Sequence, residues 1–106
     1  MTKSQLNFEQ LFAIVKAKIA SKENGSYTYE IAAKGVEKMT RKIGEEALEV
    51  VIAAFLREKL GDKKSHDELV GELCDLFFHS FILMAAEGVE LEEILQEFAR
   101  RNSLKK

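Results

Sequence analysis

Apolar residues recur through most of the chain at the spacing of amphipathic helices. Between residues 6 and 20 they return every three or four positions, which predicts a first helix over 6–20. The polar stretch 21–29 ends this pattern and predicts a turn. Thr28 has the hydroxyl side chain that favours a helix N-cap, so we expect a second helix to open at Tyr29 and to be interrupted at Gly35.

Two long helices and a shorter one are predicted in the rest of the chain. The first covers 36–60 and stops before a glycine suited to a helix C-terminus. Residues 61–68 are strongly polar and predict a solvated connection, in which Ser65 and the glutamate three residues later form a capping-box signature. The helix that this signature opens is expected to stop at Gly88, and a last helix is expected over 91–101.

The two central helices are apolar on nearly every side. Residues 47–56 are interrupted only by Glu49, and residues 73–86 only by Asp75, His79 and one serine. A helix that is hydrophobic all round must be buried all round, and one chain of 106 residues offers few neighbours for this. We therefore expect a single all-α domain over 1–106, with four to five helices in an antiparallel helical bundle that is completed by homodimerisation.

Composition and charge narrow the functional classes. The chain has no proline, 46% hydrophobic residues and 32% charged residues, which excludes a disordered chain and favours long helices. A formal net charge of −2 gives no basic surplus, so we expect no nucleic-acid binding. The longest uncharged stretch, 76–86, is about half of the roughly 20 residues that cross a membrane, and the N-terminus lacks the apolar core of a signal peptide. With Cys74 as its one cysteine, expected to be a small buried apolar residue, the chain is predicted to be cytoplasmic.

The acidic residues that interrupt the apolar helices fall on one face of each helix. At about 100° per residue, one helix gathers four side chains within an arc of roughly 100°, and the next gathers four within about 60°. The first set is Lys42, Glu45, Glu46 and Glu49, and the second is Glu68, Glu72, Asp75 and His79. Two antiparallel helices joined by a short loop can turn these faces toward each other, so that four carboxylates converge: Glu46, Glu49, Glu72 and Asp75.

Four converging carboxylates repel one another, and a divalent cation is the simplest way to hold them together. Ligation by oxygen alone suits Mg²⁺, with Mn²⁺ as the alternative ion. The lack of a Glu-x-x-His pair argues against a di-iron site, and Cys74 points about 100° away from Asp75 on the helix, which disfavours zinc. A structural alternative stays open, in which the acids pair with Lys42 and Arg41 along the helix and Asp75 accepts a hydrogen bond from His79.

Basic residues lead along the same helix into the acidic face. Lys34, Lys38, Arg41 and Lys42 form this basic stripe. On an acidic chain it is a local means of attracting anionic phosphates. A solvated face with internal salt pairs is the alternative explanation.

At two places the sequence resembles a known enzyme family. These are residues 26–54, SYTYEIAAKGVEKMTRKIGEEALEVVIAA, and 72–101, ELCDLFFHSFILMAAEGVELEEILQEFARR. They are similar to the phosphoribosyl-ATP pyrophosphohydrolases of histidine biosynthesis, which are MazG-like all-α nucleotide pyrophosphohydrolases, and the likeness spans residues 11–101. The ExxE and ExxD pairs are common to the superfamily, whereas the SYT element, the KxGEEAxEV run and the DLxxH element are specific to this branch.

The resemblance implies a mostly dimeric helical protein that converts phosphoribosyl-ATP and water to phosphoribosyl-AMP and pyrophosphate with Mg²⁺. By motif match, the implied metal ligands are Glu46, Glu49, Glu72 and Asp75. The implied catalytic residues are Glu45 or Glu49, as ligand or proton acceptor, and Lys42, on the phosphates. The expected substrate-binding residues include three members of the basic stripe. They are Ser26, Tyr27, Thr28, Lys38, Arg41, Lys42 and His79.

The chain departs from the family pattern at Phe78, where many relatives have tyrosine, and at Asn102, where histidine is common. Many relatives also carry a fused cyclohydrolase domain, and since none is present here we expect a separate chain to catalyse the next step. Two other functions stay open. One is a housekeeping pyrophosphohydrolase for nucleoside triphosphates, of the MazG or dUTPase-like type, that uses the same metal site. The other is a non-catalytic helical dimerisation module whose acids are structural.

Overall fold

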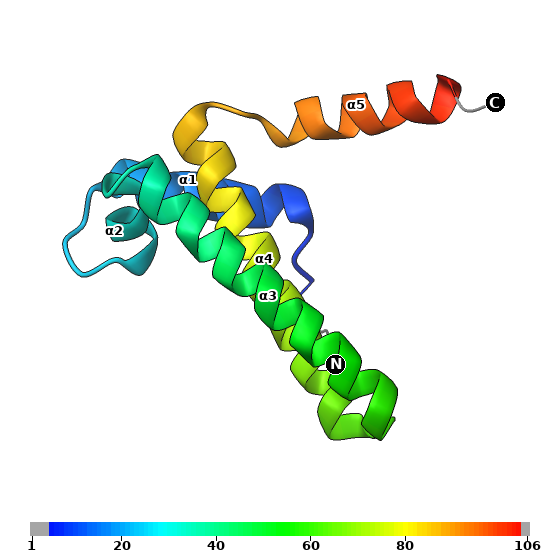
Figure 1. Ribbon diagram of the computed structural model, residues 1–106. Coiled ribbons are helices and arrows are strands. Elements are labelled where there is room, and N and C mark those ends of the chain that lie inside the picture. Colours follow the sequence, from blue (N-terminus) through cyan, green and yellow to red (C-terminus); the bar gives the residue numbers. More distant parts are fainter. Residues whose placement is uncertain (1–4, 105–106) are drawn as a thin grey trace.

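Two long helices of 25 residues each, α3 (Val36–Leu60) and α4 (Lys63–Glu87), run side by side as an antiparallel hairpin (Figure 1). The computed structural model describes residues 5–104. Its regular elements within this range are all helices, the other three being α1 (Phe8–Ser21), α2 (Tyr27–Ala33) and α5 (Leu91–Leu104). The prediction of an all-α fold with four to five helices is confirmed over these residues.

The first two helices begin where a side chain caps them. Asn7 and Gln10 form a reciprocal capping box at the start of α1, slightly later than the predicted start at residue 6. α2 begins directly after Ser26, whose hydroxyl accepts a hydrogen bond from the backbone N–H of Tyr29 at 3.4 Å. The prediction that Thr28 is the cap was wrong. Thr28 is buried inside the first turn, whereas Ser26 has the extended backbone that a cap needs.

The turn between α3 and α4 is much tighter than predicted. α3 ends as expected at Gly61, whose φ of +64° lies in the left-handed region that glycine adopts without strain. α4 begins directly after Asp62, whose carboxylate accepts a hydrogen bond from the backbone N–H of Ser65 at 2.9 Å. The predicted connection over 61–68 was therefore wrong. Ser65 lies inside the helix, buried, and its hydroxyl donates to the Asp62 carbonyl at 3.0 Å. α4 stops at Gly88, as predicted.

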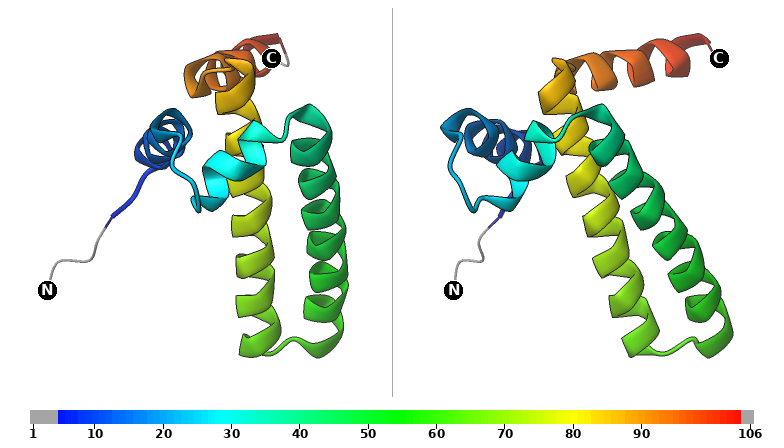
Figure 2. Two further views of the ribbon diagram at one scale, coloured as in Figure 1. Left: turned by 90° about the vertical axis from the view of Figure 1, so that its left-hand side faces the viewer. Right: turned by 60° about the vertical axis from the view of Figure 1, so that its left-hand side comes forward.

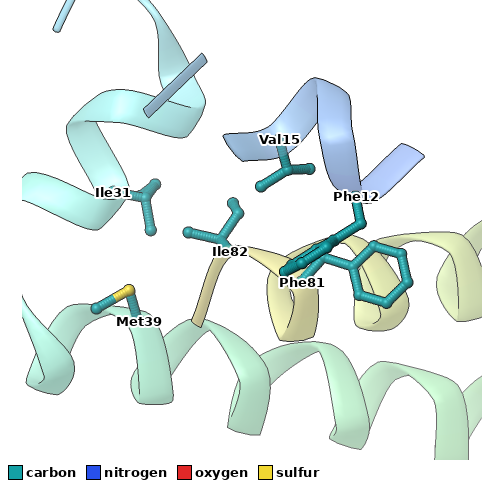
Figure 3. Close-up of a cluster of buried hydrophobic side chains, with 6 residues drawn as sticks. All are labelled: Phe12, Val15, Ile31, Met39, Phe81 and Ile82. Carbon is teal, nitrogen blue, oxygen red and sulfur yellow. The ribbon is translucent and has the colours of Figure 1, made fainter. Parts of the chain in front are cut away.

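The hydrophobic core lies at one end of the hairpin, where α1 and α2 pack across α4 and the start of α3 (Figure 2). Phe12 of α1 and Phe81 of α4 pack edge to face there, with ring centroids 5.7 Å apart. This core fixes α2, and with it Tyr27, against the C-terminal half of α4. Six buried side chains from four helices form it (Figure 3): Phe12, Val15, Ile31, Met39, Phe81 and Ile82.

The last helix, α5, projects away from the rest of the chain (Figures 1 and 2). It makes no more than passing contact with the other described helices, and its side chains Leu95 and Phe98 are exposed. An ion pair of 3.1 Å between Lys16 and Glu90 ties the segment before α5 to α1. α5 continues to Leu104, past the predicted end at residue 101.

The rest of the hairpin leaves large apolar side chains uncovered. Leu48, Val51 and Ile52 of α3 are exposed, and Phe55 is 73% exposed. The accessible surface of the 12.0 kDa chain is 7902 Å², against about 6000 Å² for a compact chain of this mass. The radius of gyration is 16.0 Å, against about 13 Å for a compact domain of this length. Cys74 was predicted to be buried, and this was wrong, because no described helix covers its side of α4.

α4 is, among residues 5–104, the one helix long and apolar enough to cross a membrane by length and composition. It carries Glu72, Asp75 and His79 along its length, and ionisable groups are costly inside a bilayer. The core helices of soluble proteins pass the same test.

Candidate metal and phosphate site

Three carboxylates meet between the two helices of the hairpin. Glu46 comes from α3, and Glu72 and Asp75 come from neighbouring turns of α4. One oxygen of each carboxylate lies within 4.8 Å of the other two. The predicted convergence of the two acidic faces is confirmed for these three residues, because the tight turn sets α3 and α4 antiparallel and in contact.

Burial leaves two oxygens of this cluster without partners. Glu46 is 7% exposed. Its Oε1 atom and the Oε1 atom of Glu72 are buried and have no hydrogen-bond partner among residues 5–104. An unpartnered buried carboxylate oxygen is costly, and a hard divalent cation ligated by oxygen would satisfy it. The donor set fits such an ion, whereas a structural zinc site would use histidine or cysteine ligands.

Two carboxyl groups of the cluster, those of Glu46 and Glu72, hold their protons more tightly than isolated carboxyl groups. The pKa of Glu46 is raised, first by burial and then by the charges of Glu49 and Asp75. The pKa of Glu72 is raised, first by the neighbouring Glu49 carboxyl group and then by burial. Glu49, the fourth predicted ligand, thus borders the cluster, although its oxygens lie outside the group that converges within 4.8 Å. A divalent cation would relieve this mutual repulsion.

Lys42 is the basic side chain that reaches the acidic cluster. Its Nζ atom lies 3.9 Å from a Glu46 oxygen and 3.3 Å from a Glu45 oxygen. The hydrogen bond to Glu45 is the main reason that the pKa of Lys42 is raised, against an opposing effect of desolvation. Lys42 therefore stays charged at the edge of the site. Glu45 is directed to Lys42 rather than to the three converging oxygens.

The predicted basic stripe is interrupted in the structure. Arg41 pairs with Glu37 at 3.8 Å, and both side chains are exposed. Lys38 lies on the same helix, half-buried. Lys34 lies outside α3, at the C-cap of α2, because Gly35 separates the two helices. The prediction of a stripe along one helix was therefore wrong at Lys34.

A hydrogen-bonded pair from α2 and α4 lies next to the acids. His79 is 6% exposed, and both of its ring nitrogens have partners. Its Nδ1 atom lies 2.8 Å from the main-chain oxygen of Asp75, and its Nε2 atom lies 2.7 Å from the hydroxyl oxygen of Tyr27. The fold thus brings together two residues that were predicted separately, and His79 contacts the backbone of Asp75 instead of its carboxylate.

Ser26, Thr28 and Phe78 are neighbours of this pair, whereas Asn102 lies apart on α5. The Ser26 hydroxyl caps α2, and Thr28 is 3% exposed beneath it. Phe78, which stands where tyrosine is common, packs edge to face on the ring of His79 with centroids 5.6 Å apart. Asn102 is exposed in the last turns of α5.

Two open grooves flank these residues. One of about 530 Å³ runs past the acids and is lined by Glu49, Ile52 and Leu56 of α3 and by Glu72 and Asp75 of α4. The other, of about 600 Å³, lies beside the loop between α1 and α2 and is lined in part by Tyr27 and Phe78. Sequence analysis missed Ile52 and Leu56 as site residues. Their spacing from Glu49 on one face of α3 is the signal that could have found them.

Comparison with known proteins identifies the family to which this chain is similar. The family model described as phosphoribosyl-ATP pyrophosphohydrolase matches residues 8–102. A relative from Sulfurisphaera tokodaii named phosphoribosyl-ATP pyrophosphatase is 37% identical over 93 residues, which cover 88% of this chain and 92% of the relative. Another of the same name, from Erythrobacter litoralis, is 42% identical over 96 residues, which cover 91% of this chain and 86% of the relative.

A third relative is longer than this chain. The protein from Oceanobacillus iheyensis named histidine biosynthesis bifunctional protein HisIE is 43% identical over 104 residues, which cover 94% of this chain and 45% of the relative. The family match extends over nearly all of the described residues and includes the hairpin that carries the acidic cluster. The chain therefore belongs to the phosphoribosyl-ATP pyrophosphohydrolase family.

Proposed function

We propose that this chain hydrolyses phosphoribosyl-ATP to phosphoribosyl-AMP and pyrophosphate, in histidine biosynthesis, with Mg²⁺ as cofactor. The observation that carries the proposal is the cluster of Glu46, Glu72 and Asp75, whose buried oxygens lack partners, on a chain of this family. The names of the relatives supply the substrate and the reaction. Mn²⁺ is the alternative ion, because it accepts the same oxygen ligands.

The acids and Lys42 divide the phosphate-binding role. Glu46, Glu72 and Asp75 would hold the ion, with Glu49 beside them as a fourth ligand or as a base. When bound, the ion supplies neutralisation of the negative charge on the phosphate oxygens. Lys42, charged at the edge of the cluster, binds the phosphates that leave as pyrophosphate. To do so it exchanges its contact with Glu45, at 3.3 Å, for a phosphate oxygen.

Hydrolysis of the α–β phosphoanhydride bond needs a group that takes the proton of the attacking water. We assign this role to Glu49, which lines the groove along the acids and lies outside the three converging oxygens. Glu45 is the second candidate, since it is released when Lys42 turns to the substrate. The water oxygen then bonds to the α-phosphorus, and the bridging oxygen leaves with pyrophosphate.

The remaining substrate contacts are assigned to the residues around α2 and the start of α3. Tyr27 lines the second groove, and Lys38 and Arg41 extend the positive charge of Lys42 along α3. Ser26 and Thr28 hold the start of α2 in place beneath the substrate, and His79 anchors Tyr27.

We also propose that the chain works as a homodimer in the cytoplasm. Its accessible surface exceeds that of a compact chain by roughly 1900 Å², which is of the order that each subunit of an obligate dimer buries. The exposed apolar side chains of α3, such as Leu48 and Phe55, are the surface that a second copy would cover. We further propose that a separate cyclohydrolase chain acts on the product.

The test is the release of pyrophosphate from phosphoribosyl-ATP, measured with and without Mg²⁺. We expect turnover that EDTA abolishes and that the double variant Glu49→Gln/Asp75→Asn lacks. Glu58→Gln makes the same replacement as Glu49→Gln further along α3, on an exposed residue outside the groove, and should stay active. Turnover that survives EDTA, or a fully active double variant, would contradict the metal-dependent mechanism.

Two further results would redirect the assignment. Rapid hydrolysis of dUTP, dCTP or ATP with none of phosphoribosyl-ATP would favour a housekeeping nucleoside triphosphate pyrophosphohydrolase. No turnover of any of these, together with no rise in melting temperature on adding Mg²⁺, would favour a non-catalytic dimerisation module.

A further inference from the structure

The groove that runs past the acids has no basic side chain in its lining among residues 5–104. Its volume of about 530 Å³ is bounded by four acids, three aliphatic side chains and one glycine. Three of these acids have roles in the proposed function, and the fourth, Glu68, has none. Phosphate oxygens can therefore be held in this groove only at the ion, because carboxylates repel them. The rest of the groove suits a part of the substrate that carries no negative charge.

The far end of the groove, lined by Ile52, Leu56 and Glu68, lies on the opposite side of the acids from Lys42. Along α3, Lys42 comes seven residues before Glu49 and Leu56 comes seven residues after it, which is about 10 Å in each direction. α4 runs antiparallel to α3, so Glu68 lies on the same side of the acids as Leu56. A triphosphate whose terminal phosphates meet Lys42 thus extends its nucleoside toward this far end.

Two aliphatic side chains of α3 form one wall of the far end. Ile52 and Leu56 are each about half exposed, and they lie about 60° and 20° from Glu49 around the helix axis. Phe55, which the second subunit is proposed to cover, lies about 120° from Glu49 by the same count. The wall beside the acids is therefore a separate face of α3 from the proposed subunit contact. An apolar wall next to bound phosphates suits the flat ring of a nucleobase.

Glu68 lines the same end of the groove from α4. It lies one turn before Glu72 on the face of α4 that is turned toward α3. Its side chain is exposed and has no hydrogen-bond or ion-pair partner among residues 5–104. An ionised carboxylate only accepts hydrogen bonds, so it binds an amino group and repels a carbonyl oxygen. Adenine carries such an amino group on the edge of its ring.

We propose that the far end of the groove is the nucleobase subsite. Ile52 and Leu56 pack against the adenine ring, and Glu68 is a specificity-determining residue that accepts a hydrogen bond from the adenine amino group. The inference rests on the proposed function, in which the ion and Lys42 hold the phosphates. It adds the direction in which the substrate lies along the hairpin, with the pyrophosphate toward Lys42 and the base toward the turn at Gly61.

The test compares kcat/KM for phosphoribosyl-ATP with kcat/KM for phosphoribosyl-ITP, in which a carbonyl oxygen replaces the amino group of the base. We expect the wild-type protein to prefer phosphoribosyl-ATP. Glu68→Gln supplies an amide that pairs with either group, and should reduce this preference about tenfold, the factor for one hydrogen bond to a charged group. Glu58→Gln makes the same replacement on an exposed residue outside the groove and should keep the wild-type preference.

A second pair of variants tests the apolar wall. Leu56→Ala removes contacts with the ring, and should lower kcat/KM about tenfold for both substrates without changing the preference between them. Leu60→Ala makes the same replacement one turn further along α3, on an exposed residue outside the groove, and should leave kcat/KM unchanged. The mass of each variant is measured by light scattering at the assay concentration, because a second subunit is the competing occupant of this wall.

The outcomes distinguish this inference from the function beneath it. If the wild-type protein shows no preference, or if Glu68→Gln keeps the wild-type preference, the inference is overturned and the proposed function stands. The same conclusion follows if Leu56→Ala is as active as Leu60→Ala, or if it loses activity only by becoming a monomer. If the wild-type protein releases no pyrophosphate from phosphoribosyl-ATP, the proposed function is overturned and the inference falls with it.

Discussion

Replacing Glu46 by glutamine should stabilise the metal-free protein and remove its response to Mg²⁺. Glu46 is 7% exposed, has a buried oxygen without a partner, and shares the cluster with two other carboxylates. Glutamine keeps the shape of the side chain and removes the charge. The metal-free variant is relieved of repulsion, and the same change deletes a ligand that the ion needs.

The size of the effect follows from the distances. Two like charges 4.8 Å apart repel by about 0.9 kcal/mol in water and about 3.5 kcal/mol at an effective dielectric constant of 20. Asp75 is exposed, so solvent screening moves its repulsion of Glu46 toward the lower value, and Lys42 at 3.9 Å offsets part of it. We expect a gain of about 1–2 kcal/mol in the free energy of unfolding, which is about 5–10 °C in Tm for a domain of this size.

The assay is thermal unfolding followed by circular dichroism at pH 8 and one protein concentration, in EDTA and in increasing Mg²⁺. The wild-type Tm should rise with Mg²⁺. At a Mg²⁺ concentration a hundred times the dissociation constant, the free energy of unfolding should be higher by about 2.7 kcal/mol. Glu46→Gln should start higher in EDTA and stay flat, while Glu58→Gln should behave as wild type. The reasoning is refuted if Glu46→Gln melts lower than wild type in EDTA, or if Mg²⁺ raises its Tm as much.

Three other expectations follow from the structure. Because the pKa values of Glu46 and Glu72 are raised, the metal-free folded chain binds protons that the unfolded chain releases, and this contribution to stability falls as pH rises above about 4.5. The Mg²⁺-induced rise in Tm should therefore be larger at pH 8 than at pH 5.5. An equal rise at both pH values would contradict this. Phe55→Glu places a charge on a side chain that is 73% exposed in the single chain, and should shift light-scattering mass from dimer to monomer; an unchanged dimer would place the interface elsewhere. Gly61→Ala puts a Cβ at φ +64° in the turn between α3 and α4, and should lower the unfolding free energy by about 1 kcal/mol in denaturant titrations, whereas Gly71→Ala, at an ordinary helical position, should not.

The sequence predicts the end of a helix well where one residue nearby suits that end, and poorly where several residues do. The ends of α3 and α4 could be predicted because Gly61 and Gly88 are the only residues nearby that adopt the left-handed conformation without strain. The starts of α2 and α4 could not. Each is preceded by several hydroxyl or acidic side chains, and the choice of Ser26 and Asp62 depends on which neighbours are buried.

The same distinction holds for the site. The acids could be found from their spacing, because periodicity on one helix and a tight turn suffice to bring Glu46 opposite Glu72 and Asp75. The bond between Tyr27 and His79 could not, because it depends on how α2 lies across α4, and that is set by the core around Ile31 and Ile82.

The position of the core at one end of the hairpin has a consequence for how the molecule opens. Among residues 5–104, the far half of the hairpin, roughly from the acids to Gly61, is supported only by contact between α3 and α4. Its amide protons should exchange with solvent faster than those around Met39 and Ile82, because local opening there exposes little additional apolar surface. The acids lie at the boundary of the two halves. Any contact that stabilises the far half, including contact with a second subunit, therefore also restricts the movement of the ion-binding oxygens. Catalytic activity per chain should therefore decline on dilution before any loss of helix content is seen.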